Sequence, residues 1–351
     1  MKKSIITALA LGSWMLMPSC SKEFSTNATY KPVTVVYGFL NIADTAQYIK
    51  IERAFQNGTN GDATSIAQNP DSLYYKNLDA RVQELTNGTV TNTFLLQEVN
   101  MNAEGYPKEP GTFASSSNIG YKFKAALRAD KTYRLVILNP QSGETITAET
   151  PIVTNDPNKF KFTFLFTSPT ISVNLSDPTK TISPACIAPP YAKMFTMVMR
   201  FRYMEKNTNT GTLTAKYVDW IMADQVKTAT TTGGAVAKPS NDVSNNSFYE
   251  ILGNDIPAAE PGIERYVDSI EARYWAGGEV FSNYIDVASA QGGITNDQIK
   301  PTYTNLSGKL SLGLFNTRTV RTMRTTLSAS TIGTLKTDPR TAPLRFVGTV
   351  Y

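Results

Sequence analysis

The cysteine at position 20 is the residue whose surroundings most clearly favour covalent chemistry. Lys2 and Lys3 begin the chain, residues 5–17 form a short run dominated by apolar side chains, and Ser19 precedes Cys20. A basic start, a short apolar stretch and a small residue before the cut are typical of a secretory signal peptide. A cysteine just after the cut is where a lipoprotein signal peptidase exposes a thiol for acylation. We therefore expect cleavage before Cys20 and lipid, such as palmitate, on that residue.

A plain signal peptide followed by a chance cysteine is the alternative. The chain has two cysteines among 351 residues, so chance placement at the cut is the weaker explanation. The lipoprotein interpretation makes residues 1–19 the signal peptide and residues 20–30, which are mostly polar, a short tether. One acyl chain holds a protein on a membrane only marginally. Resemblance to bacterial lipoprotein cysteines implies several chains and hence a durable anchor.

The composition excludes several kinds of catalytic site. The chain contains no histidine, which removes histidine-based acid–base catalysis, Ser-His-Asp and Cys-His arrangements and histidine metal sites. With Cys20 acylated, Cys186 has no partner for an internal disulfide. Its apolar, proline-rich neighbourhood favours a buried, inert thiol, because a reactive one needs nearby positive charge. We expect no cofactor.

Paired carboxylates are the minimum that a glycosidase requires. Asp268, Glu271 and Glu279 are the candidates for a hydrolase acting on envelope or dietary glycans. Residues 267–274 alternate in the manner of a strand, which predicts that Asp268 and Glu271 point to opposite faces. This spacing argues against a simple catalytic pair.

Two segments carry weaker signals for ligand binding. Residues 57–62 offer oxygen atoms suited to calcium but lack the spacing and terminal glutamate of an EF-hand, so a polar loop across residues 56–71 is favoured. Trp220 and Trp275 remain after signal-peptide removal, and exposed aromatic faces would suit a carbohydrate. For Trp275 we favour a buried position at a strand end. No metal site is predicted.

The charge distribution argues against nucleic acid as a partner. The formal net charge is +5, and the two signal-peptide lysines supply part of it, which leaves +3 after cleavage. Near the end, Arg318, Arg321 and Arg324 recur every third residue among threonines, which favour a strand; Arg318 and Arg324 then share a face. We favour arginines that protect an edge strand from aggregation. Contact with an acidic partner or with lipid headgroups is the alternative.

We expect strands to position the candidate residues described above, because apolar residues recur at every second position through much of the sequence. In residues 48–55 and 121–127, apolar side chains alternate with charged ones, which puts one side on a core and the other in water. Several short strands of this kind, separated by turns, predict an immunoglobulin-like β-sandwich over residues 31–154. Residues 154–158 (Thr-Asn-Asp-Pro-Asn) mark the boundary of this domain.

The rest of the chain, residues 155–351, predicts a larger β-rich domain with a few short helices, so the fold class is mainly β. One helix is expected from a cap at Ser247 to an end at Gly253, and a second after Gly278. Rows of large apolar residues at two-residue spacing favour strands that face a core, and they lie at 160–166, 195–203 and 218–222.

Segments of this chain resemble a known group of bacterial proteins. Residues 301–308 (Pro-Thr-Tyr-Thr-Asn-Leu-Ser-Gly), followed by residues 312–315 (Leu-Gly-Leu-Phe), resemble a segment near the C-terminus of uncharacterised Bacteroidetes lipoproteins with domains of unknown function. Residues 36–38, 110–113 and 133–135 fit the same group. Alternatively, Gly308, Gly313 and Phe315 simply shape a turn and fill a core.

This resemblance implies a lipoprotein anchored in the cell outer membrane, facing the periplasm or the cell surface, with an N-terminal immunoglobulin-like domain and no assigned activity. The first functional hypothesis is a non-enzymatic binding or structural module for a protein or polysaccharide partner, held at the membrane by lipid. The second is an envelope or glycan-directed hydrolase. We expect no nucleic-acid partner.

Overall fold

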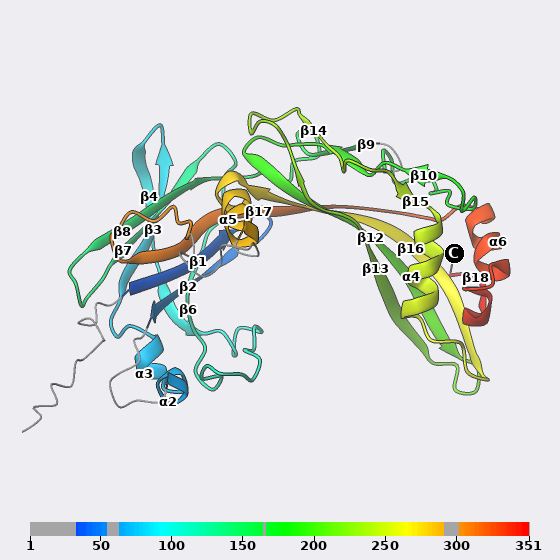
Figure 1. Cartoon of the computed structure of the whole chain (residues 1–351), viewed down its shortest axis with the longest axis horizontal. Coiled ribbons are helices and arrows are strands. Elements are labelled where there is room, and N and C mark those ends of the chain that lie inside the picture. The colour runs from blue at the N-terminus through cyan, green and yellow to red at the C-terminus, as the bar shows by residue number, and fades with distance from the viewer. Residues whose placement is uncertain (1–32, 55–62, 164–165, 291–301, 351) are drawn as a thin grey trace, which may run out of the picture.

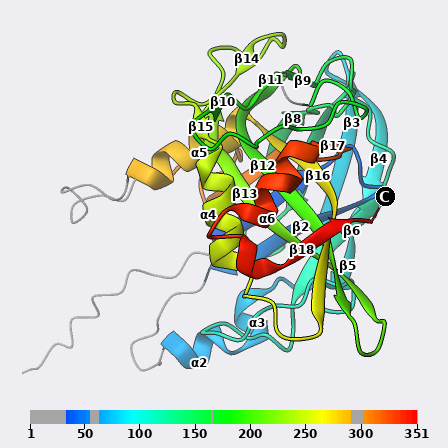
Figure 2. The ribbon, with the colours of Figure 1, turned by 90° about the vertical axis from the view of Figure 1, so that its right-hand side faces the viewer.

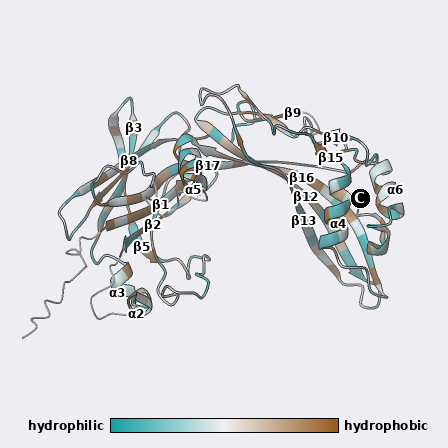
Figure 3. Cartoon of the chain, viewed as in Figure 1, coloured by the Kyte–Doolittle hydropathy of each residue, from teal (hydrophilic) through white to brown (hydrophobic). Residues whose placement is uncertain are grey.

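The protein is mainly β, with a few short helices, as predicted. Figure 1 shows two lobes joined by strands that run from one lobe into the other. Hydrophobic residues concentrate on the strands, whereas the connecting loops are mainly hydrophilic (Figure 3). The computed structural model describes residues 33–54, 63–163, 166–290 and 302–350.

The first lobe is a sandwich of two sheets with the strand order of an immunoglobulin-like domain. One sheet has the order β1-β2-β6-β5 and the other the order β4-β3-β7-β8. Lettering the strands A, B, C, C′, D, E, F and G along the chain gives A-B-E-D packed on C′-C-F-G, which confirms the predicted sandwich. The strands are β1 (Val33–Leu40), β2 (Ala46–Ala54), β3 (Asp79–Thr86), β4 (Thr89–Leu95), β5 (Gln97–Asn100), β6 (Ile119–Lys124), β7 (Thr132–Leu138) and β8 (Thr145–Pro151).

A buried tyrosine ties the start of β7 to the segment before it. The backbone N–H of Arg128 donates to the Tyr133 hydroxyl at 3.1 Å, and this hydroxyl donates to Glu84 Oε2 at 2.8 Å. Immunoglobulin-like domains place a tyrosine with the same role at this corner. Burial raises the pKa of Tyr133 above its ordinary value, so the phenol stays protonated and keeps both bonds.

The second lobe is built on long antiparallel strands in the order β13-β12-β16-β17, with β18 beside β16. One face of this sheet packs against short strands and helices, and Figure 2 views the lobe from the end where the helix α6 and the strand β18 lie. The elements are β9 (Lys161–Thr163), β10 (Thr181–Ile182), β11 (Ala185–Ile187), β12 (Ala192–Asn207), β13 (Leu213–Lys227), β14 (Val236–Ala237), β15 (Val243–Ser244), α4 (Asn246–Asp255), β16 (Ile263–Gly278), α5 (Glu279–Ala290), β17 (Ser311–Thr325), α6 (Ala329–Thr337) and β18 (Phe346–Thr349).

The predicted apolar rows form the core of the second lobe. From β12, alternate residues between Phe195 and Tyr203 are buried, and Trp220 of β13 packs beside Phe248 of α4. The described members of the row at 160–166 are buried too, and Phe164 lies outside the described residues. As expected, the large apolar residues at two-residue spacing lie on the side of each segment that faces the core.

The predicted helices form with shifted bounds. The helix expected to end at Gly253 is α4, which begins at Asn246 and continues to Asp255 before Pro257 forces an extended residue. Gly253 instead lets α4 approach the Arg340 carbonyl, because a Cβ there would lie 3.0 Å from that oxygen. The helix expected after Gly278 is α5. Two short helices, α2 (Ala63–Ala67) and α3 (Pro70–Leu73), replace part of the predicted loop.

Strand β17 belongs to both lobes. Residues 311–317 pair in parallel with β1, and residues 318–325 pair antiparallel with β16, which makes one nine-stranded sheet (Figure 1). In the arginine segment, residues 318–325 pair with β16 alone among the described strands, which agrees with the predicted edge strand. The division into residues 31–154 and 155–351 stays a prediction, although a strand from the later segment completes the first lobe.

Gly313 and Phe315 explain how β17 fits against β1. Gly313 has φ +94°, and a Cβ there would overlap the carbonyl oxygen of Val36. Phe315 is fully buried in the core of the first lobe, against Gly38. The alternative that Phe315 fills a core is confirmed, whereas Gly313 lies within a strand and allows a close backbone approach instead of shaping a turn.

The predicted lipid site cannot be placed in this fold. Cys20, the signal peptide 1–19 and the tether 20–30 lie outside the described residues, as does the polar segment 57–62. Across the described ranges, no helix is both long and apolar enough to cross a bilayer.

Candidate functional site

The candidate site lies on the outer face of the nine-stranded sheet, opposite the two cores. Two cavities of 360 and 220 Å³ adjoin there, because both are lined by Phe39 of β1 and Arg318 of β17. We call this surface the aromatic groove and define it by Phe39, Tyr48, Tyr106, Trp275, Phe281 and Arg318.

The 360 Å³ cavity is mainly apolar and draws on both lobes. Its walls include Trp275 of β16, Phe39 and Phe281 of α5, and the last two meet edge to face at 5.2 Å between ring centroids. Gly277 makes room for this helix, because a Cβ there would lie 2.8 Å from the Phe281 ring. The cavity therefore depends on α5 lying directly on the sheet.

We predicted that Trp275 is buried at a strand end, and this prediction is wrong. Trp275 is 36% exposed and points from the outer face of β16, with the Arg273 guanidinium 5.7 Å from its ring centroid. The neighbours Tyr274 and Ala276 point to the core instead. The alternation of β16 therefore carries the indole outward, whereas Trp220 is buried as a core residue.

The 220 Å³ cavity combines aromatic rings with polar groups. Tyr48 and Tyr106 meet at 5.2 Å between ring centroids, and the Tyr48 hydroxyl donates to Glu104 Oε2 at 2.7 Å. This bond raises the pKa of Tyr48, while bonds from Lys122 and from Tyr48 hold the pKa of Glu104 below its usual value. The Tyr48 ring is thus fixed in one orientation at the cavity wall.

The lysine in the second cavity is occupied by structural contacts. Lys50 Nζ donates to Asn118 Oδ1 at 2.8 Å and to the Ile119 carbonyl at 2.6 Å, and it lies 3.2 Å from Glu52 Oε1. Burial lowers the pKa of Lys50. Its three donors are directed at protein oxygens, so Lys50 holds the loop before β6 against β2.

The described arginines are placed as the strand interpretation predicted. Arg318 and Arg324 lie on the outer face, whereas Arg321 points to the inner side, 5.1 Å from the Phe162 ring centroid. Arg318 lies 5.8 Å from the Phe39 ring centroid at the junction of the two cavities. Burial lowers the pKa of Arg321.

The candidate carboxylates are held by arginines. A bulge at Asp268 breaks the alternation of β16, so the predicted opposite orientation of Asp268 and Glu271 is wrong. Asp268 accepts from Arg324, and Glu271 lies 3.2 Å from Arg202 Nη2 and 3.3 Å from Arg273 Nε. Glu279 lies apart from both, at the start of α5 and in a different cavity. The structure does not assemble the three into one cluster.

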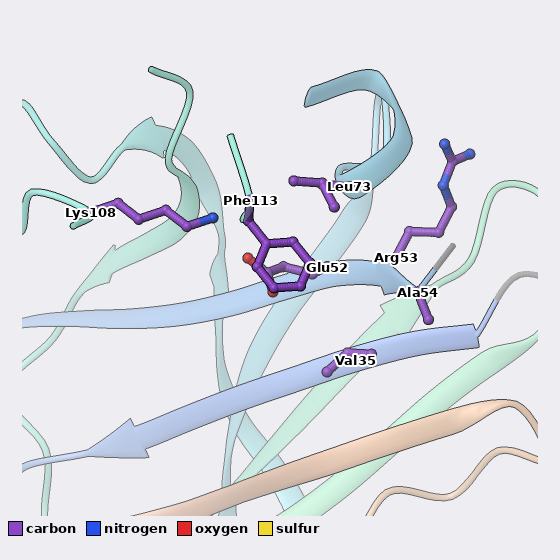
Figure 4. Close-up of a pocket in the computed structure, with 7 residues that line it drawn as sticks. All are labelled: Val35, Glu52, Arg53, Ala54, Leu73, Lys108 and Phe113. Atoms are coloured by element: carbon purple, nitrogen blue, oxygen red, sulfur yellow. The ribbon is translucent and has the colours of Figure 1, made fainter. Parts of the chain in front are cut away.

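A separate cavity of 390 Å³ lies further along the outer face of the first lobe (Figure 4). Val35 and Ala54 lie along its strands, Phe113 and Leu73 cover it, and Lys108 points towards Phe113. Ala54 is the last described residue before the segment 55–62. We place the candidate site in the aromatic groove, because its two adjoining cavities share residues of both lobes.

Cys186 is fully buried, as predicted. Burial raises the pKa of its thiol to about 12, so the thiolate that reacts with electrophiles is scarce at neutral pH. Within the described ranges, no group of three or more histidine, cysteine, aspartate or glutamate side chains is arranged to hold a metal ion.

Comparison with known proteins leaves the function open. No protein-family model matches the chain, and no curated protein matches its sequence. Among solved structures, CBD12 from CALX1.2 is 11% identical, with a TM-score of 0.20 over 84% of this chain and 100% of that chain. The calcium-binding domain CBD12 of CALX1.1 is 9% identical, with a TM-score of 0.17 over 81% and 98%. At these scores the likeness supports no functional assignment.

Proposed function

We propose that this protein is a non-enzymatic binding module of the cell envelope, anchored in the outer membrane by lipid on Cys20, and that it binds a saccharide chain in the aromatic groove. The observation that carries the proposal is the pair of adjoining cavities that share Phe39 and Arg318 across both lobes. Concave, largely apolar surfaces with a few placed polar groups are where ligands bind.

The chemistry of the groove favours a saccharide over a peptide. Trp275, Tyr48 and Tyr106 present aromatic surface, and the apolar C–H face of a sugar ring packs on such surface. The groove lies on the face of a sheet, above the ladders that join β16 to β17 and β1 to β2. An extended peptide adds to the edge of a sheet and not to its face, so the groove itself does not suit strand addition.

Binding without catalysis is the second element of the proposal. Glycoside hydrolysis requires two carboxyl groups that flank the bond. The described lining of the two cavities contains one acid, Asp44, which accepts a bond from Asn41 at 2.8 Å. The outer-face acids Asp268 and Glu271 are occupied by arginines. This arrangement supports a site that holds a sugar rather than one that cleaves it.

The groove is tested by titrating the purified lipoprotein, in detergent, with oligosaccharides from bacterial and plant polysaccharides. We expect Trp275→Ala to weaken binding of a ligand by about tenfold or more, since aromatic residues carry much of such binding energy. Tyr266→Ala is the matched control, because it lies on the same strand nine residues away, or about 30 Å. Absence of binding to every saccharide, or equal loss in both variants, would refute the groove as the binding site.

The anchor is tested separately. Cys20→Ala should abolish incorporation of labelled palmitate and release the protein from the membrane fraction, because the sequence offers this one acylation site at the predicted cut. Continued labelling of the variant would show that the lipoprotein interpretation is wrong, whatever the groove binds.

A further inference from the structure

Arg318 differs from the other arginines on the outer face of the sheet. Among the described residues no carboxylate lies within ion-pair distance of it, and its recorded contact is with the Phe39 ring at 5.8 Å. The remaining outer-face arginines all have acidic partners: Arg200 with Asp219 at 2.7 Å, Arg202 and Arg273 with Glu271, and Arg324 with Asp268.

The position of this charge is as informative as its lack of a partner. Arg318 is exposed, and it is the one charged residue in the described lining of the 360 Å³ cavity. The other lining groups there are apolar or, at Thr196, neutral. A cation that faces an apolar cavity without an anion is complementary to a ligand that supplies the anion.

The second cavity restricts where a ligand anion can lie. Asp44 lies in that cavity and would repel a carboxylate placed beside it. Lys50 cannot serve as an alternative anion site, because its donors are already directed at Asn118, Ile119 and Glu52. A ligand carboxylate is therefore favoured at Arg318 on the side of the 360 Å³ cavity, with neutral hydroxyl groups towards Asp44.

We propose that the aromatic groove selects acidic saccharides, with the carboxylate of a hexuronic acid paired to the Arg318 guanidinium and its ring packed between Trp275 and Phe39. A hexuronic acid combines an apolar ring face with a planar carboxylate, and arginine binds a carboxylate through two parallel N–H···O bonds. The inference rests on the proposed function, because it names the class of saccharide that the same groove takes.

The experiment compares two probes that share a sugar backbone and differ in whether their carboxyl groups are ionised or methyl-esterified. Tetragalacturonate and its fully methyl-esterified form are titrated into the detergent-purified lipoprotein at low and at physiological salt. We expect the acid to bind about tenfold more tightly than the ester, with the preference shrinking as salt rises. Arg318→Gln should reduce this preference to near unity, and Arg318→Lys should retain part of it, because lysine keeps the charge without the bidentate geometry.

Arg324→Gln is the matched control, because Arg324 lies on the same strand and face but is already paired. It should leave the preference unchanged. Equal binding of acid and ester, a preference that survives Arg318→Gln, or binding of neutral glycans alone would overturn the acidic-saccharide inference and leave the proposed function standing. Failure of every saccharide to bind would overturn both, and binding of a peptide carboxylate at Arg318 would replace the saccharide class.

Discussion

Substitution of Gly313 by alanine should uncouple the two lobes. The residue has φ +94°, which alanine adopts at a cost of roughly 1–3 kcal/mol. The new Cβ would also overlap the Val36 carbonyl, and overpacking of this kind costs a further ~1–3 kcal/mol. The combined loss, roughly 2–6 kcal/mol, is large against the 5–15 kcal/mol that typically stabilises a domain.

The two lobes can be observed separately during urea unfolding of a lipid-free form, residues 20–351 with Cys20→Ser. Trp220 lies in the core of the second lobe, whereas Trp275 lies in the cavity between the lobes. With Trp275 replaced by phenylalanine in every variant, tryptophan fluorescence reports the second lobe while far-ultraviolet circular dichroism reports both. In the parent protein we expect coincident transitions, because β17 joins the lobes. In Gly313→Ala the dichroism signal should begin to fall at lower urea, by roughly 1–2 M, than the fluorescence.

Gly333→Ala is the matched glycine control. Gly333 lies within α6, and a Cβ there meets nothing within 4 Å, so alanine should leave stability unchanged or raise it by up to ~1 kcal/mol. If Gly313→Ala unfolds at the parent's urea midpoint with coincident signals, the claim that β17 joins the lobes energetically is refuted.

Cys186 should resist iodoacetamide at pH 8 in the folded protein and react after unfolding, because burial raises the pKa of its thiol to about 12. Rapid alkylation of the folded protein, detected by mass spectrometry, would contradict this. The bond from Arg340 holds the pKa of Asp338 below its ordinary value, so the stabilisation is present at neutral pH and lost as pH falls through the lowered value. An unpaired aspartate has a pKa of about 3.9. Between about pH 5 and 2, Asp338→Asn should therefore lose less stability than the parent, and an identical dependence of stability on pH in the two proteins would count against the pair. The purified protein should not turn over glycan, ester or peptide substrates, and activity that vanishes on mutation of one Asp, Glu or Ser would overturn the non-enzymatic proposal.

Strand positions and core faces could be predicted because a strand that is buried on one side has apolar residues at every second position. The row from Phe195 to Tyr203 and the alternation around Ile49 and Ile51 both match the structure. In β1 the alternation of apolar and polar residues is weak. Val35, Tyr37 and Phe39 alternate with Val36 and Leu40, so both faces of the strand are apolar. An apolar outer face was the available signal that something covers or binds this sheet.

The aromatic groove could not be predicted, because its residues meet only through long-range pairing. Phe39 and Arg318 are brought together by the parallel alignment of β1 with β17, and no local pattern encodes that neighbour. The arginine spacing of β17 indicated an edge strand, but it could not show that the two halves of this strand pair with different partners, β1 and β16. Likewise, a bulge at Asp268 reversed one side-chain orientation that strict alternation had predicted.

The shared strand also determines how the molecule carries load. If lipid holds the chain at Cys20, tension enters the first lobe at the start of β1, and a load on the second lobe is carried through β16 and the later half of β17. Because β1 and β17 run parallel, these opposed pulls slide the two strands along each other. Sliding strains the hydrogen bonds of the ladder together rather than one after another, so the junction resists extension as a stiff joint.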